Sequence, residues 1–168
     1  MFVVLGSSSI PPVVAADRDP IPADFSLRAE YYPVTPSAAS LDAPLAPRWH
    51  PWTLTLTADG RARQESNRTV PGKKSVIRRS SRVSPGDLQR LVMEVRRSNF
   101  HLLAPEYAFE VTPQATLVLR ITLERRSHDV TVYGPDRVKD QPEVAAFLRV
   151  WNQTLRVVPP LNPGQRPE

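Results

Sequence analysis

The chain has 168 residues, of which 40% are hydrophobic, and this is enough for one folded domain with its own core. It contains no cysteine, so disulfides, thiolate catalysis and thiolate zinc sites are excluded. The net charge of +5 and the pI of about 10.1 indicate solubility and general attraction to anions, and by themselves they do not predict nucleic-acid binding.

The first 16 residues have the pattern of a secretory signal peptide. No charged side chain precedes Asp17, and the small residues Val14 and Ala16 stand where a signal peptidase would cleave. The apolar run is shorter than the roughly 20 residues that a membrane-spanning helix needs. A disordered apolar tail is the alternative. We expect a periplasmic or secreted protein without a transmembrane segment in the mature chain.

The first predicted strand covers residues 24–32, because apolar side chains alternate along it. Residues 33–51 contain five prolines, which fix φ and remove backbone donors, so we expect a long loop there. Residues 52–64 predict a hairpin with a tight type I′ turn at Asp59 and Gly60. The inward side chains of these strands are Phe25, Leu27, Ala29, Tyr31, Trp52, Leu54 and Leu56.

Residues 75–83 predict an edge strand, because the segment is polar on both faces and basic residues flank it. A helix follows, with Ser84 as its N-cap, Pro85 at its first position and Asp87 in its first turn. It is expected to end near residues 98–99. Its apolar stripe is Leu88, Leu91, Val92 and Val95, and the residues expected to dock its exit onto the core are Phe100, Leu102 and Leu103.

A second hairpin and helix repeat this arrangement. Residues 116–124 predict a strand that turns at residues 125–127 and returns. Asp140 and Glu143 predict a capping box for the second helix, which stops at residues 159–160, a pair of prolines. The inward side chains are Leu117, Leu119, Ile121, Leu123, Val130 and Val132 in the hairpin, and Val144, Phe147, Leu148, Trp151 and Leu155 in the helix.

These elements predict an α+β fold, with an antiparallel sheet of about five to six strands and two helices packed on one face. The expected organisation is a signal peptide at 1–16, a disordered linker at 17–24, a single domain at 25–158 and a disordered tail at 159–168.

Several short segments, in this order, resemble a bacterial family of unknown function that is found mostly in exported proteins. They are residues 54–62 (LTLTADGRA), 83–91 (VSPGDLQRL), 98–103 (SNFHLL), 106–107 (EY), 116–119 (TLVL) and 130–134 (VTVYG). The resemblance spans about residues 25–157, and its motifs are structural rather than catalytic. A second, weaker similarity is to small proteinaceous inhibitors of thermolysin-type metalloproteases. Neither similarity supplies active-site residues.

The sequence predicts no metal site and no cofactor. His50, His101 and His128 are far apart in the sequence, and none has a second ligand at a metal-binding spacing. His128 and Asp129 are neighbours on a strand, so their side chains are expected on opposite faces of the sheet.

The sequence likewise predicts no catalytic residue. It contains no Gly-x-Ser-x-Gly turn that would present a serine nucleophile. Glu106 and Glu110 lie in a predicted loop without a supporting motif, so a hydrolase with separated carboxylates stays only as an alternative.

A basic stripe between residues 61 and 82 is a candidate site for an anion or an acidic partner. Arg61 and Arg63 are expected to share a strand face, and so are Arg78 and Arg82. The cluster also includes Arg68 and Arg79, and the predicted contact residues are Arg61, Arg63, Lys73, Lys74, Arg78 and Arg82. A solvated face that resists aggregation, an acidic protein, an envelope polymer and a nucleic acid are all compatible with it. No aromatic residues are interleaved with the basic ones for base stacking, which makes nucleic acid unlikely as the partner.

The end of the proline-rich loop is a candidate recognition site, because Trp49 and Trp52 flank the rigid Pro51. The alternative is that one or both tryptophans cover the sheet. We therefore predict an exported, non-enzymatic binding module whose partner is an unknown protein or envelope polymer. Three other functions stay open: an inhibitor of a secreted protease, a cytoplasmic nucleic-acid binder and the hydrolase.

Overall fold

A computed structural model describes residues 20–33, 50–70, 73–108 and 114–161, without the side chains of residues 68–70 and 73–74. The predicted signal peptide, residues 17–19 of the linker, most of the proline-rich loop with Trp49, Glu110, and residues 162–168 of the tail lie outside this part.

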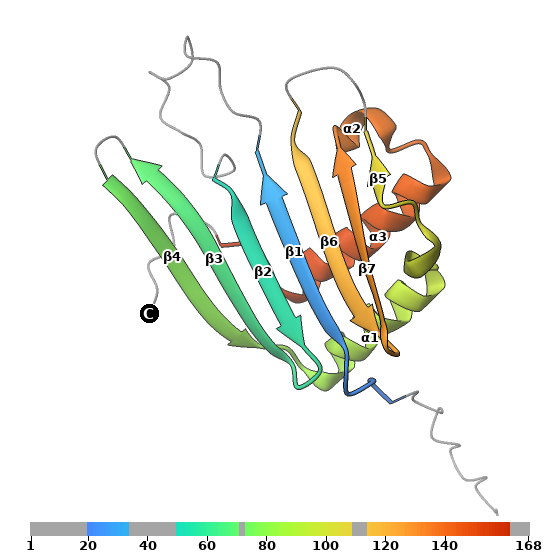
Figure 1. Ribbon diagram of the computed structural model, residues 1–168. Helices are drawn as coiled ribbons and strands as arrows, with labels where there is room; N and C mark the ends of the chain where they lie inside the picture. Colours follow the sequence, from blue (N-terminus) through green and yellow to red (C-terminus); the bar gives the residue numbers. More distant parts are fainter. Residues whose placement is uncertain (1–19, 34–49, 71–72, 109–113, 162–168) are drawn as a thin grey trace, which may run out of the picture.

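The domain has two layers, a seven-stranded sheet and a set of helices on one of its faces (Figure 1). The strand order is β4-β3-β2-β1-β6-β7-β5. The strands are β1 (Ser26–Tyr32), β2 (Trp52–Thr57), β3 (Arg61–Val70), β4 (Lys73–Arg82), β5 (Glu106–Tyr107), β6 (Thr116–Leu123) and β7 (Arg126–Tyr133). The helices are α1 (Pro85–Arg97), the 3-10 turn η3 (Phe100–Leu102), α2 (Pro135–Val138) and α3 (Pro142–Val157). The described helices include none that is long and apolar enough to cross a membrane.

Strand β1 holds the centre of the sheet and joins two blocks of the chain. It pairs antiparallel with β2 of the first block and with β6 of the second. Ala29 therefore lies opposite both Leu54 and Leu119. Each block then contributes one long helix to the same face, α1 from the first and α3 from the second.

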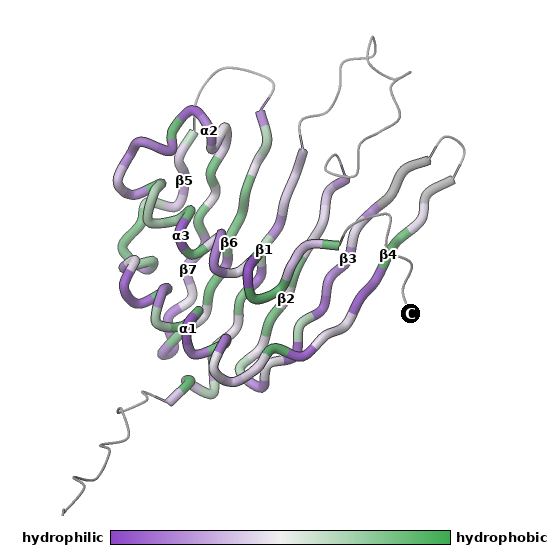
Figure 2. The backbone as a smooth tube through the Cα atoms, turned by 180° about the vertical axis from the view of Figure 1, so that it is seen from behind, coloured by the Kyte–Doolittle hydropathy of each residue, from purple (hydrophilic) through white to green (hydrophobic). Residues whose placement is uncertain are grey.

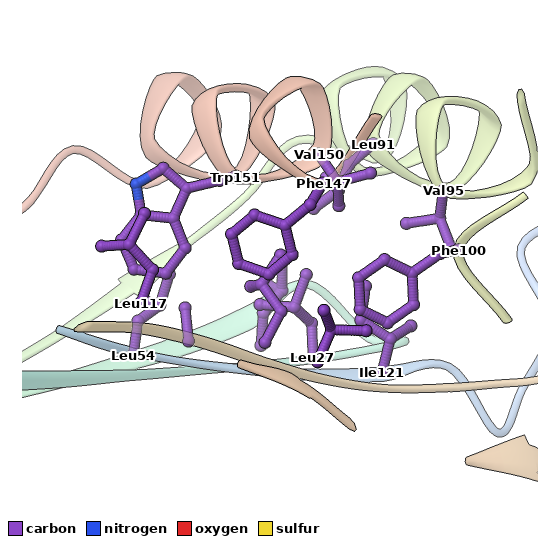
Figure 3. Close-up of a cluster of buried hydrophobic side chains, with 14 of the residues drawn as sticks. Leu27, Leu54, Leu91, Val95, Phe100, Leu117, Ile121, Phe147, Val150 and Trp151 are labelled. Carbon is purple, nitrogen blue, oxygen red and sulfur yellow. The ribbon is translucent and has the colours of Figure 1, made fainter. Parts of the chain in front are cut away.

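The core lies between this face of the sheet and the two long helices (Figure 3). As predicted, alternate strand residues such as Leu27 and Ile121 point to the helices and are buried. Leu91 of α1 and Phe147 of α3 meet them from the other layer, and α1 and α3 pack against each other. Burying each large apolar side chain stabilises the fold by about 1.5–3 kcal/mol, so this interface holds the two layers together.

The predicted start of α1 is confirmed. The Ser84 hydroxyl accepts a hydrogen bond from the Asp87 N–H at 3.1 Å, and Pro85 occupies the first turn, where its missing N–H has no partner to lose.

The sheet differs from the prediction in strand number and in one strand direction. It has seven strands rather than five or six, and β5 pairs parallel with β7. β5 is only two residues long, too short for an alternating pattern to reveal it. It is anchored by the Pro105 carbonyl, which accepts a hydrogen bond from the Thr131 N–H at 2.9 Å. The third helix, α2, is a single turn and was missed for the same reason.

Two local predictions around the helices are wrong. Asp140 and Glu143 form no capping box, because Pro142 takes the first helical position and moves the N-cap to Gln141, which makes no side-chain cap hydrogen bond. Leu102 does not dock onto the core and is 81% exposed. A 3-10 turn has three residues per turn, so Phe100 and Leu103 share the buried face while Leu102 points away.

Both hairpin turns differ in length from the prediction, which expected a two-residue turn in the first hairpin and a three-residue turn in the second. In the first, only Gly60 has a positive φ, at 79°, and its N–H donates to the Thr57 carbonyl at 2.9 Å. This is a three-residue loop with glycine in the left-handed position rather than a type I′ turn. The second hairpin has a two-residue turn instead, formed by Glu124 and Arg125 with φ of 54° and 63°.

Position 60 requires glycine because of a close neighbour as well as its positive φ. A Cβ at this position would lie 2.7 Å from the Val83 carbonyl oxygen. The Gly60 carbonyl also accepts a hydrogen bond from the Val83 N–H at 2.8 Å, so the backbone there cannot move away without losing it.

We predict that Gly60→Ala lowers the free energy of unfolding by about 2–4 kcal/mol, because it combines an unfavourable φ with a backbone clash. Gly86→Ala is the matched control, since a Cβ there meets nothing within 4 Å. Its stability should be unchanged or raised by up to about 1 kcal/mol. Urea unfolding followed by circular dichroism measures both, and equal stability of the two variants would contradict the prediction.

Candidate functional site

In the described part of the chain, no element covers the face of the sheet opposite the helices, and most of its side chains are polar. The described helices lie on the other face, and Figure 2 shows them from their own side, with β4 at the right, to the side of the helices. The alternation that points apolar residues into the core points their neighbours outward. The arginines on this open face are Arg28, Arg61, Arg63, Arg78, Arg82 and Arg120, and the carboxylates are Glu30, Glu65 and Asp129.

One row of side chains crosses the open face from β3 to β7. The strand registers place Arg63 beside Thr55, Thr55 beside Arg28, Arg28 beside Arg120 and Arg120 beside Asp129. Neighbouring strands lie about 4.8 Å apart, so three guanidinium groups from three strands share one line. Asp129 at the end of the row is the only carboxylate in it, and Arg120 binds it with two nitrogens at 2.6 and 2.8 Å.

A second group of arginines lies on β3 and β4. Arg61 stands opposite Arg82, and Arg78 stands opposite Glu65, with 2.9 Å between the Arg78 Nε and the carboxylate oxygen. The Arg61 Nε lies 3.0 Å from a carboxylate oxygen of Asp59 in the turn. These pairs are exposed to solvent, which screens them, so they orient the arginines more than they stabilise the fold.

Of the six arginines on the open face, Arg63 and Arg82 have no ion pair in the described structure, and of these two only Arg63 lies in the row. Arg63 is exposed. Its neighbours on the adjacent strands are Thr55 of β2 and Ser80 of β4, so no carboxylate lies directly opposite it. Arginines outnumber carboxylates on this face, which leaves it positively charged.

Two carboxylates of the open face, Glu30 and Asp129, are held in their charged form. The hydrogen bonds from Arg120 lower the pKa of Asp129 from its usual value, against the effect of partial burial. Partial burial of Glu30 acts to raise its pKa, but hydrogen bonds from Tyr32 and Arg28 outweigh this, and the net effect lowers the pKa of Glu30. Both groups are therefore ionised at neutral pH.

The predicted basic stripe is brought together in part. Arg61, Arg63, Arg78 and Arg82 share the open face, whereas Arg79 lies opposite Gln64 on the other face. Lys73 and Lys74 belong to β4, and Arg68 to β3, but the described part of the chain does not include their side chains.

Sequence reasoning missed Arg28 and Arg120, because they are isolated in the sequence and join the stripe only through the pairing of β1 with β2 and β6. A signal was present, since each stands between two apolar residues at an outward position of a predicted strand.

Trp52 lies at the inner face of the sheet. Its ring stacks between Tyr31, with centroids 5.9 Å apart, and Trp151 of α3, with centroids 5.5 Å apart. Phe147 continues the stack at 6.2 Å from Trp151. Trp52 therefore connects the sheet to α3 and packs against the core. Its predicted role in recognition stays a prediction.

Two of the histidines are close together, which their sequence separation did not indicate. The ring centroids of His101 and His128 are 6.3 Å apart, and Phe100 contacts both rings edge-on. His128 Nε2 lies 2.8 Å from the Leu103 carbonyl oxygen. His128 is opposite Ile121 on the core side of β7, while Asp129 is on the open face, as expected. Within the described ranges, no three histidine, aspartate or glutamate side chains are grouped as a metal site requires.

His101 has two buried ring nitrogens without a hydrogen-bond partner in the described structure. Burial lowers the pKa of His101 from its usual value of 6.5, and the electrostatic effects of the neighbouring His128 and Arg126 lower it further. Glu124 acts in the opposite direction but is outweighed. The folded protein therefore favours the neutral imidazole.

Glu106, the described member of the predicted carboxylate pair, is exposed in β5. No protein-family model matches the chain, and a search of curated proteins returned no significant match. The family resemblances of the sequence thus stay predictions, and the open face supports a functional proposal by its own chemistry.

We predict that the stability of the protein falls as the pH is lowered below about 6.5, because the unfolded chain binds a proton at His101 that the folded chain disfavours. Above that pH both states hold the neutral ring and this contribution is constant. His101→Phe should reduce the fall, and it should keep or raise stability at neutral pH because no ring nitrogen is left unpaired.

Urea unfolding of both proteins between about pH 5 and about pH 8 measures the difference, since most carboxylates titrate below this range. Parallel curves for the two proteins across this range would show that His101 does not carry the effect.

Proposed function

We propose that this chain is an exported, non-enzymatic binding module that uses the open face of its sheet to hold an acidic partner protein. The observation that carries the proposal is the row in which Arg63, Arg28 and Arg120 come together from three strands. A positive surface built on paired strands is rigid, so little conformational freedom is lost when it binds.

The threonine side chains that lie among the arginines suit a partner surface that carries carboxylates. Thr53, Thr55 and Thr57 stand at alternate positions of β2, between the arginines of β3 and the arginine of β1. The Thr57 hydroxyl already donates to Asp59, but those of Thr53 and Thr55 can donate hydrogen bonds to the same anionic oxygens that the guanidinium groups attract.

The electrostatics of the face support a binding role over catalysis. A general acid needs a carboxyl whose pKa is raised toward neutrality. The pKa values of Glu30 and Asp129 are instead lowered, so these groups cannot act as proton donors at neutral pH.

The position of the aromatic residues supports a protein partner over a nucleic acid. Tyr32 and Tyr133 lie in one row at the end of the face, opposite Thr116. The Tyr32 hydroxyl donates a hydrogen bond to Glu30, and the Tyr133 hydroxyl accepts one from the Gln114 N–H. The arginine row itself contains Thr55 and Asp129 beside its arginines and no aromatic side chain, so it lacks the stacking surface on which bases would lie.

We predict that the chain binds poly-glutamate with an affinity that falls between about 50 and 200 mM salt. Arg28→Gln with Arg63→Gln should weaken binding about tenfold, because it removes two charges from the row. The matched control, Arg97→Gln with Arg156→Gln, removes the same charge from the last turns of α1 and α3 and should change binding less than about twofold.

Fluorescence anisotropy with labelled poly-glutamate and a labelled oligothymidylate measures these affinities. Equal losses in the two double variants, or no binding of poly-glutamate at low salt, would overturn the proposal. Tighter binding of the oligothymidylate would favour the nucleic-acid alternative.

The export part of the proposal rests on the sequence pattern of residues 1–16, and the first core residues that the structure describes are Ile21 and Phe25. We predict that the native protein from fractionated cells starts at Asp17 and is found in the periplasm or the medium. N-terminal sequencing and intact mass measure this, and an intact Met1 in the cytoplasm would be the opposite result.

A further inference from the structure

The two edges of the sheet are different. One edge is β5, which has two residues and follows Pro105. The other edge is β4, which has ten residues and pairs with β3 along its whole length without a break in register. Proteins usually blunt exposed edges with short strands, prolines, bulges or charges, because an open edge is a template for another strand. In β4, charge is the only one of these devices.

β4 is also exposed on both of its faces. Val76 is 48% exposed on the open face, and the residues from Arg78 to Arg82 are exposed on both. Of the described β4 side chains, only Ser75 and Ile77 are half-buried. The strand therefore depends on β3 for its position, and no other described strand pairs with its second side.

The direction of the free backbone groups follows from one hydrogen bond. The Val83 N–H donates to the Gly60 carbonyl at 2.8 Å, so residue 83 points its backbone groups toward the β3 side. Successive residues of a strand point these groups to alternate sides. The free edge is therefore formed by the backbone of every second residue, which are Val76, Arg78, Ser80 and Arg82. The side chains of these same residues lie on the open face.

Charge decides which strand can pair there. β4 contains five basic residues, Lys73, Lys74, Arg78, Arg79 and Arg82, and no acidic one. Pairing with a second copy of β4 would bring like charges together, which is destabilising. An acidic strand is attracted instead. The sheet already contains one such contact, since Glu65 of β3 binds Arg78 from its other side at 2.9 Å.

We propose that the free edge of β4 takes up an extended acidic segment of another protein as an eighth strand. The inference rests on the proposed function for the acidic nature of the partner and adds the mode of binding. Main-chain hydrogen bonds to Val76, Arg78, Ser80 and Arg82 hold the segment, and alternate carboxylates lie beside Arg78 and Arg82 on the open face. The repulsion between Arg82 and its opposite neighbour Arg61 is reduced by such a carboxylate.

Amide hydrogen exchange of the full chain, followed residue by residue by NMR, tests the mode of binding. The probe is a capped peptide of about eight residues that alternates glutamate and valine, long enough to cover the edge. In the free chain the N–H groups of Val76, Arg78, Ser80 and Arg82 should exchange fast, and those of Ile77, Arg79 and Ser81 slowly. With the peptide, the first set should become protected. A peptide N-methylated at alternate residues should have no effect.

Ser80→Pro removes one free-edge N–H and keeps the hydrogen bonds to β3, a change that edge strands tolerate. It should weaken peptide binding at least about tenfold, while Ser80→Ala, which keeps the N–H, should stay within about twofold. Both variants should keep the circular dichroism spectrum and the poly-glutamate binding of the wild type.

The outcomes separate this inference from the proposed function. If Ser80→Pro binds the peptide like the wild type while Arg28→Gln with Arg63→Gln does not, the acidic segment lies on the face and the edge inference is overturned alone. If neither the peptide nor poly-glutamate binds the wild type, both are overturned. If the edge N–H groups are already protected in the free chain, the edge is occupied by another part of the chain or by a second copy, and the inference is overturned. Sedimentation velocity tells these two occupants apart.

Discussion

The antiparallel pairing of β1 with β2 on one side and with β6 on the other is the contact on which the rest of the structure depends. It joins two hairpin-and-helix blocks that are separate in the sequence into one sheet. Because the registers align the inward residues of all three strands, α1 and α3 find one continuous apolar surface. Ala29 is fully buried at the middle of this surface, between Leu54 and Leu119.

The same pairing creates the open face. Side chains alternate along a strand, so the register that aligns Leu27 with Leu56 and Ile121 also aligns Arg28 with Thr55 and Arg120. The core and the arginine row therefore lie on opposite faces of the same paired strands. Exposed ion pairs contribute little to stability, so the arginines of the open face can serve binding without a large effect on the fold.

The sequence predicted the elements whose physics is local. Ser84 and Pro85 define a helix start, and the alternation in residues 116–124 defines a buried strand face, and both were found. β5 was missed because two residues carry no period, and the capping box failed because Pro142 decides where α3 begins. Four of the six arginines on the open face were predicted from their clustering in the sequence. Arg28 and Arg120 join it through pairings between distant segments, which no local pattern encodes.

The two hairpin turns have a consequence for the order in which the chain folds. The first turn is favoured by nearby residues alone, since Gly60 accepts a positive φ and the Thr57 hydroxyl donates to Asp59 at 2.6 Å. The second turn places Glu124 and Arg125 at positive φ, which is unfavourable for both.

The contacts that hold this second turn are distant. The Arg125 N–H donates to Asp24, 101 residues away, and Arg96 binds Glu124 across 28 residues. The β2–β3 hairpin can therefore close early and alone, within microseconds as isolated hairpins do. Closure of the β6–β7 hairpin is coupled to the arrival of α1 and of the chain segment before β1. The two blocks look alike in the finished structure, yet we expect the first hairpin to form before the second.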